Sequence, residues 1–220
     1  LIPFFVQFIY EDRNSTFLSS ASVTAFIGIL LVLTNLEENK KLNLQQAFLL
    51  TTLSWLGIAI FGCLPFLFSN LDLSFVDAFF ESMSGITTTG STVITNLDDV
   101  SKSILIWRAI LQWLGGIGII VMAITILPLL NVGGMQLFRM ESSDTTEKIL
   151  PKTREITLII SIIYLALTFA CGISYWTAGM NIFDSIAHSM TTIATGGFST
   201  YSDSIGYFKN PKIEIISIIF

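Results

Sequence analysis

Two short segments rich in threonine and glycine contain residue types that suit the binding of a dehydrated cation. They are Ile86-Thr87-Thr88-Thr89-Gly90-Ser91-Thr92 and Ile193-Ala194-Thr195-Gly196-Gly197-Phe198-Ser199. Small residues let carbonyl oxygens approach a common axis, hydroxyl groups add oxygen ligands, and glycine permits unusual backbone angles. The sequence therefore predicts two cation-coordinating loops, and a surface turn of the same composition is the alternative.

An internal repeat relates these two loops. A shift of 107 residues aligns segment 77–92 with segment 184–199. The identical pairs are Asp77/Asp184, Ser82/Ser189, Met83/Met190, Ile86/Ile193, Thr88/Thr195 and Gly90/Gly197. A surface turn does not explain why the same loop occurs twice after the same short amphipathic segment.

The segment before each loop is too short to cross a membrane. Residues 77–86 make only about three helical turns, and we expect Asp77 and its counterpart Asp184 to be the helix N-caps. Irregular backbone at membrane depth is tolerated where it is buried in protein or lines a watery cavity. Segments 87–92 and 194–199 are therefore predicted to return from the membrane interior and to face a pore.

The composition indicates an all-α polytopic membrane protein. The chain is 52% hydrophobic and 12% charged, with a mean hydropathy of +0.74. A helical span needs about 20 mostly apolar residues, and four blocks qualify: 17–34, 44–68, 103–130 and 154–178. We also interpret 1–10 and 213–220 as parts of helices that are incomplete here, and no signal peptide is indicated.

The two loops are predicted to be parallel. Two spans lie between them, so both enter from the same face of the membrane. This excludes the opposed half-helices of an aquaporin-like pair and argues against the inverted repeats common in secondary transporters. Cys63 and Cys171 lie inside apolar blocks, where we expect buried hydrophobic side chains and neither a disulfide nor a metal site.

Charged residues near the loops suit a cation entrance. The loop face is assigned five bases, Arg13, Lys102, Arg108, Lys209 and Lys212, and nine acids, Glu11, Asp12, Asp72, Asp77, Glu81, Asp98, Asp99, Asp184 and Asp203. Acidic groups at a mouth raise the local cation concentration. His188 aligns with Glu81, and we expect a hydrogen-bonded structural residue there. Arg108 is costly inside a span unless it is paired or near the interface.

The opposite face is more basic. It contains Lys40, Lys41, Arg139, Lys148, Lys152 and Arg154, so the positive-inside rule puts the loops outside. Three further patterns have ordinary interpretations. Small residues in segment 112–118 allow close helix packing, Gly133-Gly134-Met135-Gln136 is typical of a helix stop, and Asn14-Ser15-Thr16 is a chance glycosylation sequon.

Several of these segments together resemble the Trk/Ktr/HKT family of potassium uptake proteins, and within it the TrkH type of membrane subunit. The resemblance covers most of residues 75–207. It is carried by Asp77-Ala78-Phe79-Phe80-Glu81-Ser82, Thr87-Thr88-Thr89-Gly90, Gln112-Trp113-Leu114-Gly115-Gly116-Ile117-Gly118-Ile119-Ile120, Ile126-Leu127-Pro128, Gly133-Gly134-Met135-Gln136-Leu137 and Gly196-Gly197-Phe198-Ser199.

The resemblance implies a potassium-channel-like architecture. In that family, four helix–pore-loop–helix units surround one axis and each contributes one filter strand. It implies that the carbonyl groups of Thr88, Thr89, Thr195 and Gly196 are K⁺ ligands, that Gly90 and Gly197 are the filter glycines, and that Ser91 and Phe198 flank them. Residues 1–42 would be extra N-terminal helices, 43–138 the first repeat, 139–155 a cytoplasmic linker and 156–220 the second repeat, so units three and four are absent from this sequence.

The function that follows is potassium uptake across the cytoplasmic (inner) membrane of a bacterium or archaeon. The resemblance further implies a homodimer and a cytosolic nucleotide-binding regulatory ring, which would dock on the basic segments 40–41 and 139–154. Transported K⁺ is the only ligand expected; no organic cofactor, nucleic acid or enzymatic chemistry is indicated. A sodium-coupled or mixed-cation secondary transporter and a noncatalytic membrane scaffold are the alternatives.

Overall fold

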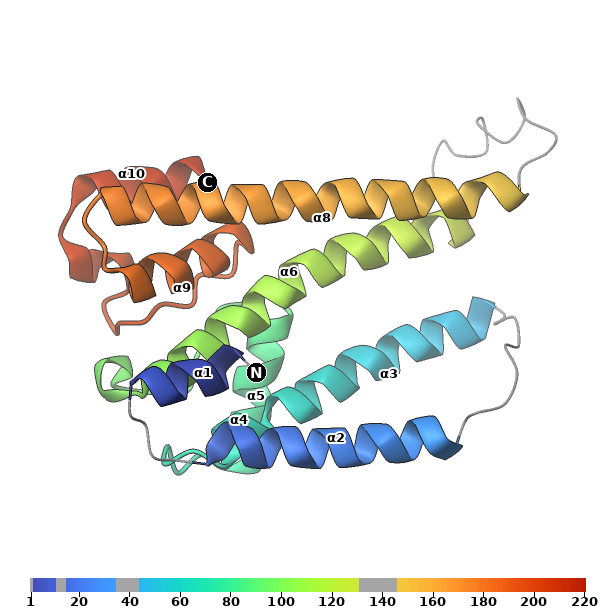
Figure 1. The fold of residues 1–220 in the computed structure, drawn as a ribbon, viewed down its shortest axis with the longest axis horizontal. Helices are drawn as coiled ribbons and strands as arrows, with labels where there is room; N and C mark the ends of the chain where they lie inside the picture. Colours follow the sequence, from blue (N-terminus) through green and yellow to red (C-terminus); the bar gives the residue numbers. More distant parts are fainter. Residues whose placement is uncertain (1, 11–14, 35–43, 131–145) are drawn as a thin grey trace.

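The computed structural model describes residues 2–10, 15–34, 44–130 and 146–220 of the chain. Helices of very different lengths make up most of this part (Figure 1). They are α1 (Ile2–Ile9), α2 (Thr16–Thr34), α3 (Leu44–Gly62), α4 (Leu64–Leu67), α5 (Phe75–Ile86), α6 (Lys102–Leu130), α8 (Thr146–Thr177), α9 (Ile182–Ile193) and α10 (Pro211–Ile219), with short 3₁₀ helices η1 (Leu97–Asp99) and η2 (Ser204–Phe208).

Some of the sequence predictions concern residues or side chains outside this description. These are the sequon at Asn14, the helix stop at Gly133, the charges of Glu11, Asp12 and Arg13, and the basic side chains of Lys40, Lys41, Arg139, Lys148, Lys152 and Arg154.

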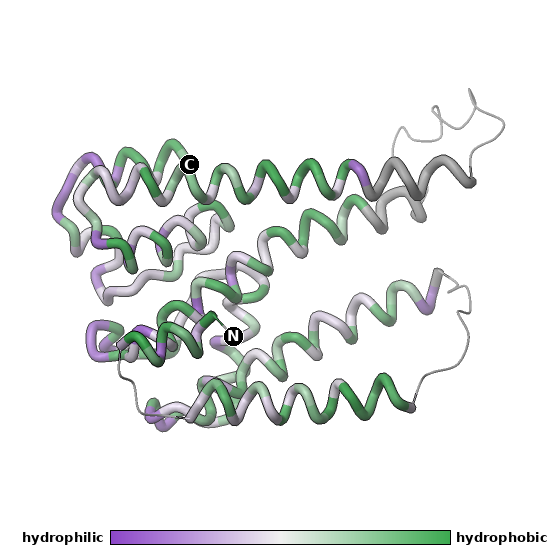
Figure 2. Tube along the Cα trace, viewed as in Figure 1, coloured by the Kyte–Doolittle hydropathy of each residue, from purple (hydrophilic) through white to green (hydrophobic). Residues whose placement is uncertain are grey.

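Among the residues that the structure describes, four helices are long and apolar enough to cross a membrane, as the four apolar blocks predict. They cover Thr16–Thr34, Gln45–Leu67, Lys102–Ile124 and Glu155–Thr177. Figure 2 shows hydrophobic residues along most of their length, with hydrophilic residues concentrated in the connections. The buried share of the apolar window is 50% for α6 but 11% for α8, so α6 is the central helix and α8 exposes most of its surface.

The second block is not one unbroken helix. Helix α3 ends at Gly62 and α4 begins at Leu64 with Pro65 in its first turn, while Cys63 between them keeps helical backbone angles. Proline has no N–H to donate to the preceding turn, so the break follows from the sequence. The four residues of α4 end beside the loop that leads to α5.

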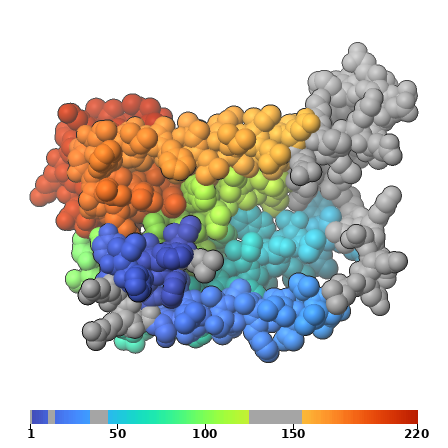
Figure 3. Space-filling model, viewed as in Figure 1, coloured from blue at the N-terminus to red at the C-terminus, as the bar shows by residue number. Residues whose placement is uncertain are grey.

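The two repeats are parallel, as predicted from the number of spans between the loops. The first unit is α3, α5 and α6, and the second is α8, α9 and α10. Helix α6 begins and α8 ends at the same end of the molecule, on the left in Figure 1, where η1 and η2 also lie. In Figure 3 the second repeat (orange and red) and α2 (blue) form opposite edges of the molecule.

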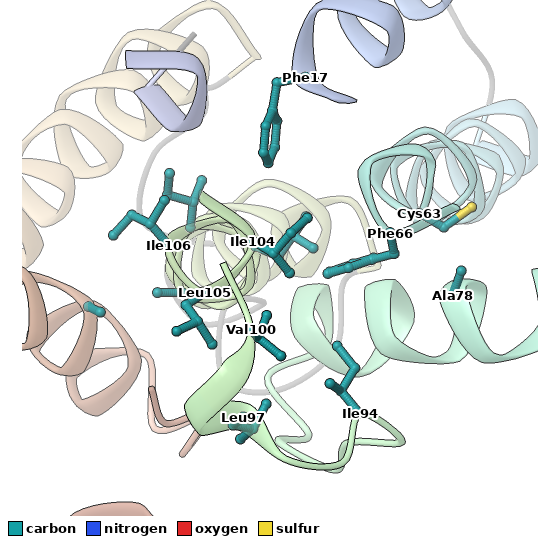
Figure 4. Packing of buried hydrophobic residues seen from close by; sticks show 14 of the residues in the cluster. Phe17, Cys63, Phe66, Ala78, Ile94, Leu97, Val100, Ile104, Leu105 and Ile106 are labelled. Carbon is teal, nitrogen blue, oxygen red and sulfur yellow. The ribbon is translucent and has the colours of Figure 1, made fainter. Parts of the chain in front are cut away.

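The hydrophobic core surrounds the first half of α6. Ile104, Leu105 and Leu111 of α6 pack with Phe66 of α4 and Ala78 of α5 in one cluster (Figure 4). Ile94, Leu97 and Val100, which follow the first Thr/Gly loop, belong to the same cluster. The core therefore anchors both the helix before this loop and the chain after it.

The structure corrects the predicted N-caps. Helix α5 is capped by Ser74 and α9 by Asn181, each with extended backbone angles. The Ser74 hydroxyl accepts from the Asp77 amide at 3.2 Å, and Asn181 Oδ1 accepts from the Asp184 amide at 2.8 Å. Asp77 and Asp184 instead lie in the first turn and accept hydrogen bonds from the cap side chains at 2.7 and 2.6 Å. Both helices start earlier than expected because a capping side chain precedes each aspartate by three residues.

Replacing either cap by alanine is expected to destabilise the protein by about 1 kcal/mol, because the first turn of the helix loses a side-chain acceptor for a backbone amide. Thermal unfolding of S74A and N181A variants of the full-length protein in detergent measures this. The control is S22A, since the exposed Ser22 hydroxyl donates only to the Leu18 carbonyl within its own helix. Equal midpoints for all three variants would contradict the assigned caps.

Candidate functional site

The two Thr/Gly loops lie side by side. A Cβ atom added to Gly90 in the first loop would collide with the carbonyl oxygen of Gly196 in the second. Thr87, Thr89, Thr195 and Gly197 are exposed, so the paired loops border open space. We call residues 87–92 the first strand and residues 194–199 the second strand.

The strands adopt the same unusual backbone conformation at equivalent positions. The angle φ is +56° at Thr88 and +53° at Thr195, and +79° at Gly90 and +77° at Gly197. Positive φ is uncommon for threonine and accessible to glycine. The 107-residue repeat thus extends from the sequence to individual dihedral angles.

The amide groups at the start of each strand donate hydrogen bonds to the preceding helix. In the first strand, the Thr88 amide donates to the Gly85 carbonyl at 3.0 Å and the Thr89 amide donates to the Ser84 carbonyl at 2.9 Å. In the second strand, the amides of Thr195 and Gly196 donate to the carbonyls of Thr192 and Thr191 at 2.8 and 2.9 Å. The C-terminal turns of α5 and α9 therefore take up the donors.

The carbonyl groups behave differently. Within the described part of the chain, no group donates to the carbonyls of six strand residues: Thr88, Thr89, Gly90, Thr195, Gly196 and Gly197. The free stretch ends at Ser91, whose carbonyl accepts from the Ser84 hydroxyl at 2.6 Å, and at Ser199, whose carbonyl accepts from Arg108 at 2.9 Å. Backbone oxygens without internal donors are the ligands that a hard monovalent cation requires.

Two glycines of α6 allow the C-terminal ends of α5 and α9 to approach this helix closely. A Cβ atom on Gly115 would collide with the Ile86 carbonyl at the end of α5. One on Gly116 would lie 3.1 Å from Ala194 Cβ at the end of α9. The close-packing role predicted for segment 112–118 is confirmed. The parts of the chain that pack against this segment of α6 are the ends of α5 and α9, from which the two strands continue.

Glu81 is not a charge at the cation mouth, contrary to the sequence prediction. Its side chain is fully buried, with 0% exposure. It accepts hydrogen bonds from the Thr92 hydroxyl at 2.9 Å and from the Val93 amide at 3.0 Å, and it forms a salt bridge with Arg108 Nε at 2.8 Å. A carboxylate on the inner face of α5 stabilises the chain that leaves the first strand.

Arg108 is likewise no surface base, because it is 1% exposed and paired with Glu81. Its pairing satisfies the condition for an arginine inside a span. Asp184 is also buried, and it accepts from the Thr200 hydroxyl at 2.8 Å and the Tyr201 hydroxyl at 3.0 Å. Glu81, Asp184 and Arg108 therefore do not contribute to an exposed charge at the predicted cation entrance.

His188 is a buried, hydrogen-bonded residue, as predicted. Its Nε2 lies 3.2 Å from the Thr200 hydroxyl. Beside it, burial raises the pKa of Tyr201, and the hydrogen bond to the negatively charged Asp184 raises this pKa further. The Tyr201 hydroxyl thus stays protonated and remains a donor, which fixes the chain after the second strand.

A second contact joins the chains that follow the two strands. The Leu97 amide donates to the Ser202 hydroxyl at 3.1 Å, and the Ser202 amide approaches Asp98 Oδ2 at 3.4 Å. Hydrogen bonding by Ser202 lowers the pKa of Asp98, so this carboxylate is ionised at neutral pH. Asp98 is a negative charge that remains exposed on the strand side.

Sequence reasoning missed one residue of the site. Gln112 Oε1 accepts from the Phe198 amide at 3.0 Å and the side chain is fully buried. Gln112 and Arg108 lie one turn apart on α6, so both face the second strand. Two polar residues at this spacing inside an apolar span are a signal that could have identified the pair.

Comparisons with known proteins agree with this arrangement. The family model described as "TrkH: Cation transport protein" matches residues 14–220. The Trk system potassium uptake protein TrkH of Escherichia coli K12 is 45% identical over 224 residues, which cover 100% of this chain and 46% of that protein. The TrkI protein of Halomonas elongata is 46% identical over 176 residues, covering 80% of this chain and 36% of that protein.

A solved structure is also similar. The crystal structure of the potassium transporter TrkH from Vibrio parahaemolyticus superposes with a TM-score of 0.88 at 40% sequence identity, over 100% of this chain and 44% of that one. The chain spans about half the length of the TrkH relatives it matches. With its repeated pore-loop units and the match over residues 14–220, the chain belongs to the TrkH family of cation transport proteins.

Proposed function

We propose that this chain supplies two strands of the selectivity filter of a potassium uptake protein. The observation that carries the proposal is the pair of strands with occupied amides, free carbonyls and matching positive φ angles at Thr88/Thr195 and Gly90/Gly197. A cation that leaves water needs several oxygen ligands at once. Two adjacent strands offer part of such a ring.

The proposed ligands are the carbonyl oxygens of Thr88, Thr89, Thr195 and Gly196. Gly90 and Gly197 allow the turn of the backbone that follows these residues, and Ser91 and Phe198 flank them. Phe198 is 4% exposed, so its ring supports the second strand from behind. K⁺ would shed its water at this ring and cross by diffusion, with no covalent step and no organic cofactor.

Two further strands would complete the ring. The chain spans about half of its relatives' length, and the resemblance to a four-unit family supplies the expected number. The proposed division of the chain puts extra helices at 1–42, the first repeat at 43–138, a linker at 139–155 and the second repeat at 156–220.

The proposed setting is the cytoplasmic membrane of a bacterium or archaeon, with the filter outside. The six bases assigned to the opposite face support this orientation. A homodimer and a cytosolic nucleotide-binding ring are the proposed partners. Exposed acids on the strand side, such as Asp98, would attract cations to the entrance.

Serine at either filter glycine is expected to lower the K⁺/Na⁺ flux ratio roughly tenfold or more, because the ring of carbonyls loses its geometry. In G90S the new Cβ collides with the Gly196 carbonyl, and both G90S and G197S require a side chain at positive φ. Flux by the full-length protein in liposomes measures the ratio.

The matched control is G57A, a glycine of α3 with ordinary φ and no atom near its added Cβ. It should keep the wild-type ratio. If G90S and G197S also keep it, the assignment of the filter is wrong. A wild-type protein that prefers Na⁺ or does not discriminate would instead support the mixed-cation alternative.

K⁺ is expected to raise the unfolding midpoint of the full-length protein more than Na⁺ at equal ionic strength, because an ion bound only to the folded state stabilises it by mass action. A K⁺ concentration about 100 times the dissociation constant would contribute about 2.7 kcal/mol. Thermal unfolding in detergent with each salt measures the difference. G57A should retain the K⁺ effect and G90S should lose it; an equal K⁺ effect in both variants would contradict ion binding at the strands.

A further inference from the structure

Helix α6 presents two buried polar side chains to the strands from behind. Arg108 is 1% exposed and Gln112 is 0% exposed, although both lie in the apolar window Lys102–Ile124. Polar groups in such a position are costly unless partners satisfy them. Their partners are the two strands and the helix that supports the first strand.

Arg108 connects three different segments. Its Nε donates to Glu81 of α5 at 2.8 Å, and its Nη1 donates to the Ser199 carbonyl at 2.9 Å. Its guanidinium also lies 4.1 Å from the centre of the Phe198 ring. A planar guanidinium can hold these groups at the same time because its donors are fixed in one fork.

Glu81 extends the connection to the first strand. Its carboxylate accepts from the Thr92 hydroxyl through both oxygens at 2.9 Å and from the Val93 amide at 3.0 Å. One continuous path of hydrogen bonds therefore runs from the end of the first strand through Glu81 and Arg108 to the end of the second strand.

Gln112 provides a parallel connection one turn farther along α6. Its Oε1 accepts from the Phe198 amide at 3.0 Å. A Cβ atom on Gly196 would collide with the Gln112 side chain, and one on Gly90 would lie 3.6 Å from Gln112 Nε2. Gln112 thus lies against the free-carbonyl part of both strands.

The second repeat lacks this arrangement. Shifted by 107 residues, Glu81 becomes His188. Helix α6 begins at Lys102 and α10 at Pro211, so the seventh position of the helix, Arg108 in α6, is Ser217 in α10. The chain after the second strand is held by Asp184 of its own repeat, through Thr200 and Tyr201, and by the contact of Ser202 with the first repeat. The Glu81–Arg108 ion pair therefore belongs to the junction between the first and second strands and does not recur in the second repeat.

We propose that Glu81, Arg108 and Gln112 form an inter-strand clamp that fixes the spacing of the two strands and thereby sets ion selectivity. These three are positioning residues that act through the strands and do not touch the ion. The proposal rests on the proposed filter function. A binding site must be held within about 0.5 Å of its productive geometry by its supporting groups, and this clamp joins two strands that are remote in sequence.

The test compares variants of the full-length protein in liposomes, with the K⁺/Na⁺ flux ratio and the thermal midpoint measured for each. R108Q is expected to lower the ratio at least tenfold, since glutamine is too short to join Glu81 to the Ser199 carbonyl. R108K should keep a charge beside Glu81 but fall between wild type and R108Q, because an ammonium lacks the guanidinium fork.

The double variant E81Q/R108Q separates positioning from simple stability. Removing one charge leaves the other buried and unpaired, whereas removing both does not. The double variant should therefore recover much of the thermal midpoint lost in R108Q while its flux ratio stays low. If both the thermal midpoint and the flux ratio recover, Glu81 and Arg108 form an ion pair with a structural role only, and the proposed clamp is wrong.

Two further variants complete the series. W107F is the control, since Trp107 is adjacent on α6 and donates to the Gly62 carbonyl at 3.0 Å, away from the strands; it should keep the wild-type ratio. G90S tests the filter itself. A low ratio in G90S with an unchanged ratio in R108Q overturns the clamp alone, while an unchanged ratio in both overturns the filter assignment and the clamp with it.

Discussion

The structure around the two strands depends on which hydrogen-bond partners their backbone amide and carbonyl groups find between membrane-spanning helices. Irregular backbone there must find partners for its polar groups or border a watery space. The ends of α5 and α9 accept from the amides of Thr88, Thr89, Thr195 and Gly196, and the carbonyls of these residues have no donor in the described chain. The short helices, the glycines of α6 and the buried polar side chains all contact the strands or the helix ends that precede them.

Burial separates two kinds of charged residue around the strands. Glu81, Arg108 and Asp184 are almost inaccessible and form hydrogen bonds inside the protein, so they contribute to the shape of the site. Asp98 is exposed and contributes to the electrostatic field around the site. In the proposed filter, backbone oxygen atoms would line the path of the ion, while the charged side chains remain behind or outside the strands. A cation bound there would not be held by a fixed carboxylate.

Much of the fold was predictable from sequence because its signals are local or periodic. Apolar blocks predict the spans, the 107-residue shift predicts the repeat, and the spans between the loops predict their parallel direction. The predicted N-caps were wrong by three positions, since serine and aspartate are both common capping residues and Ser74 and Asp77 lie close together. The Glu81–Arg108 pair is separated by 27 residues, and only the three-dimensional packing of α5 on α6 brings it together.

The most direct test is the position of bound cations in crystals of the full-length protein grown with Rb⁺ or Tl⁺ in place of K⁺. Anomalous scattering identifies these ions and measures their distances to protein oxygens. We expect peaks bordered by the carbonyl groups of Thr88 and Thr89 from one strand and of Thr195 and Gly196 from the other. Peaks confined to acidic side chains, with none beside these carbonyls, would contradict this expectation.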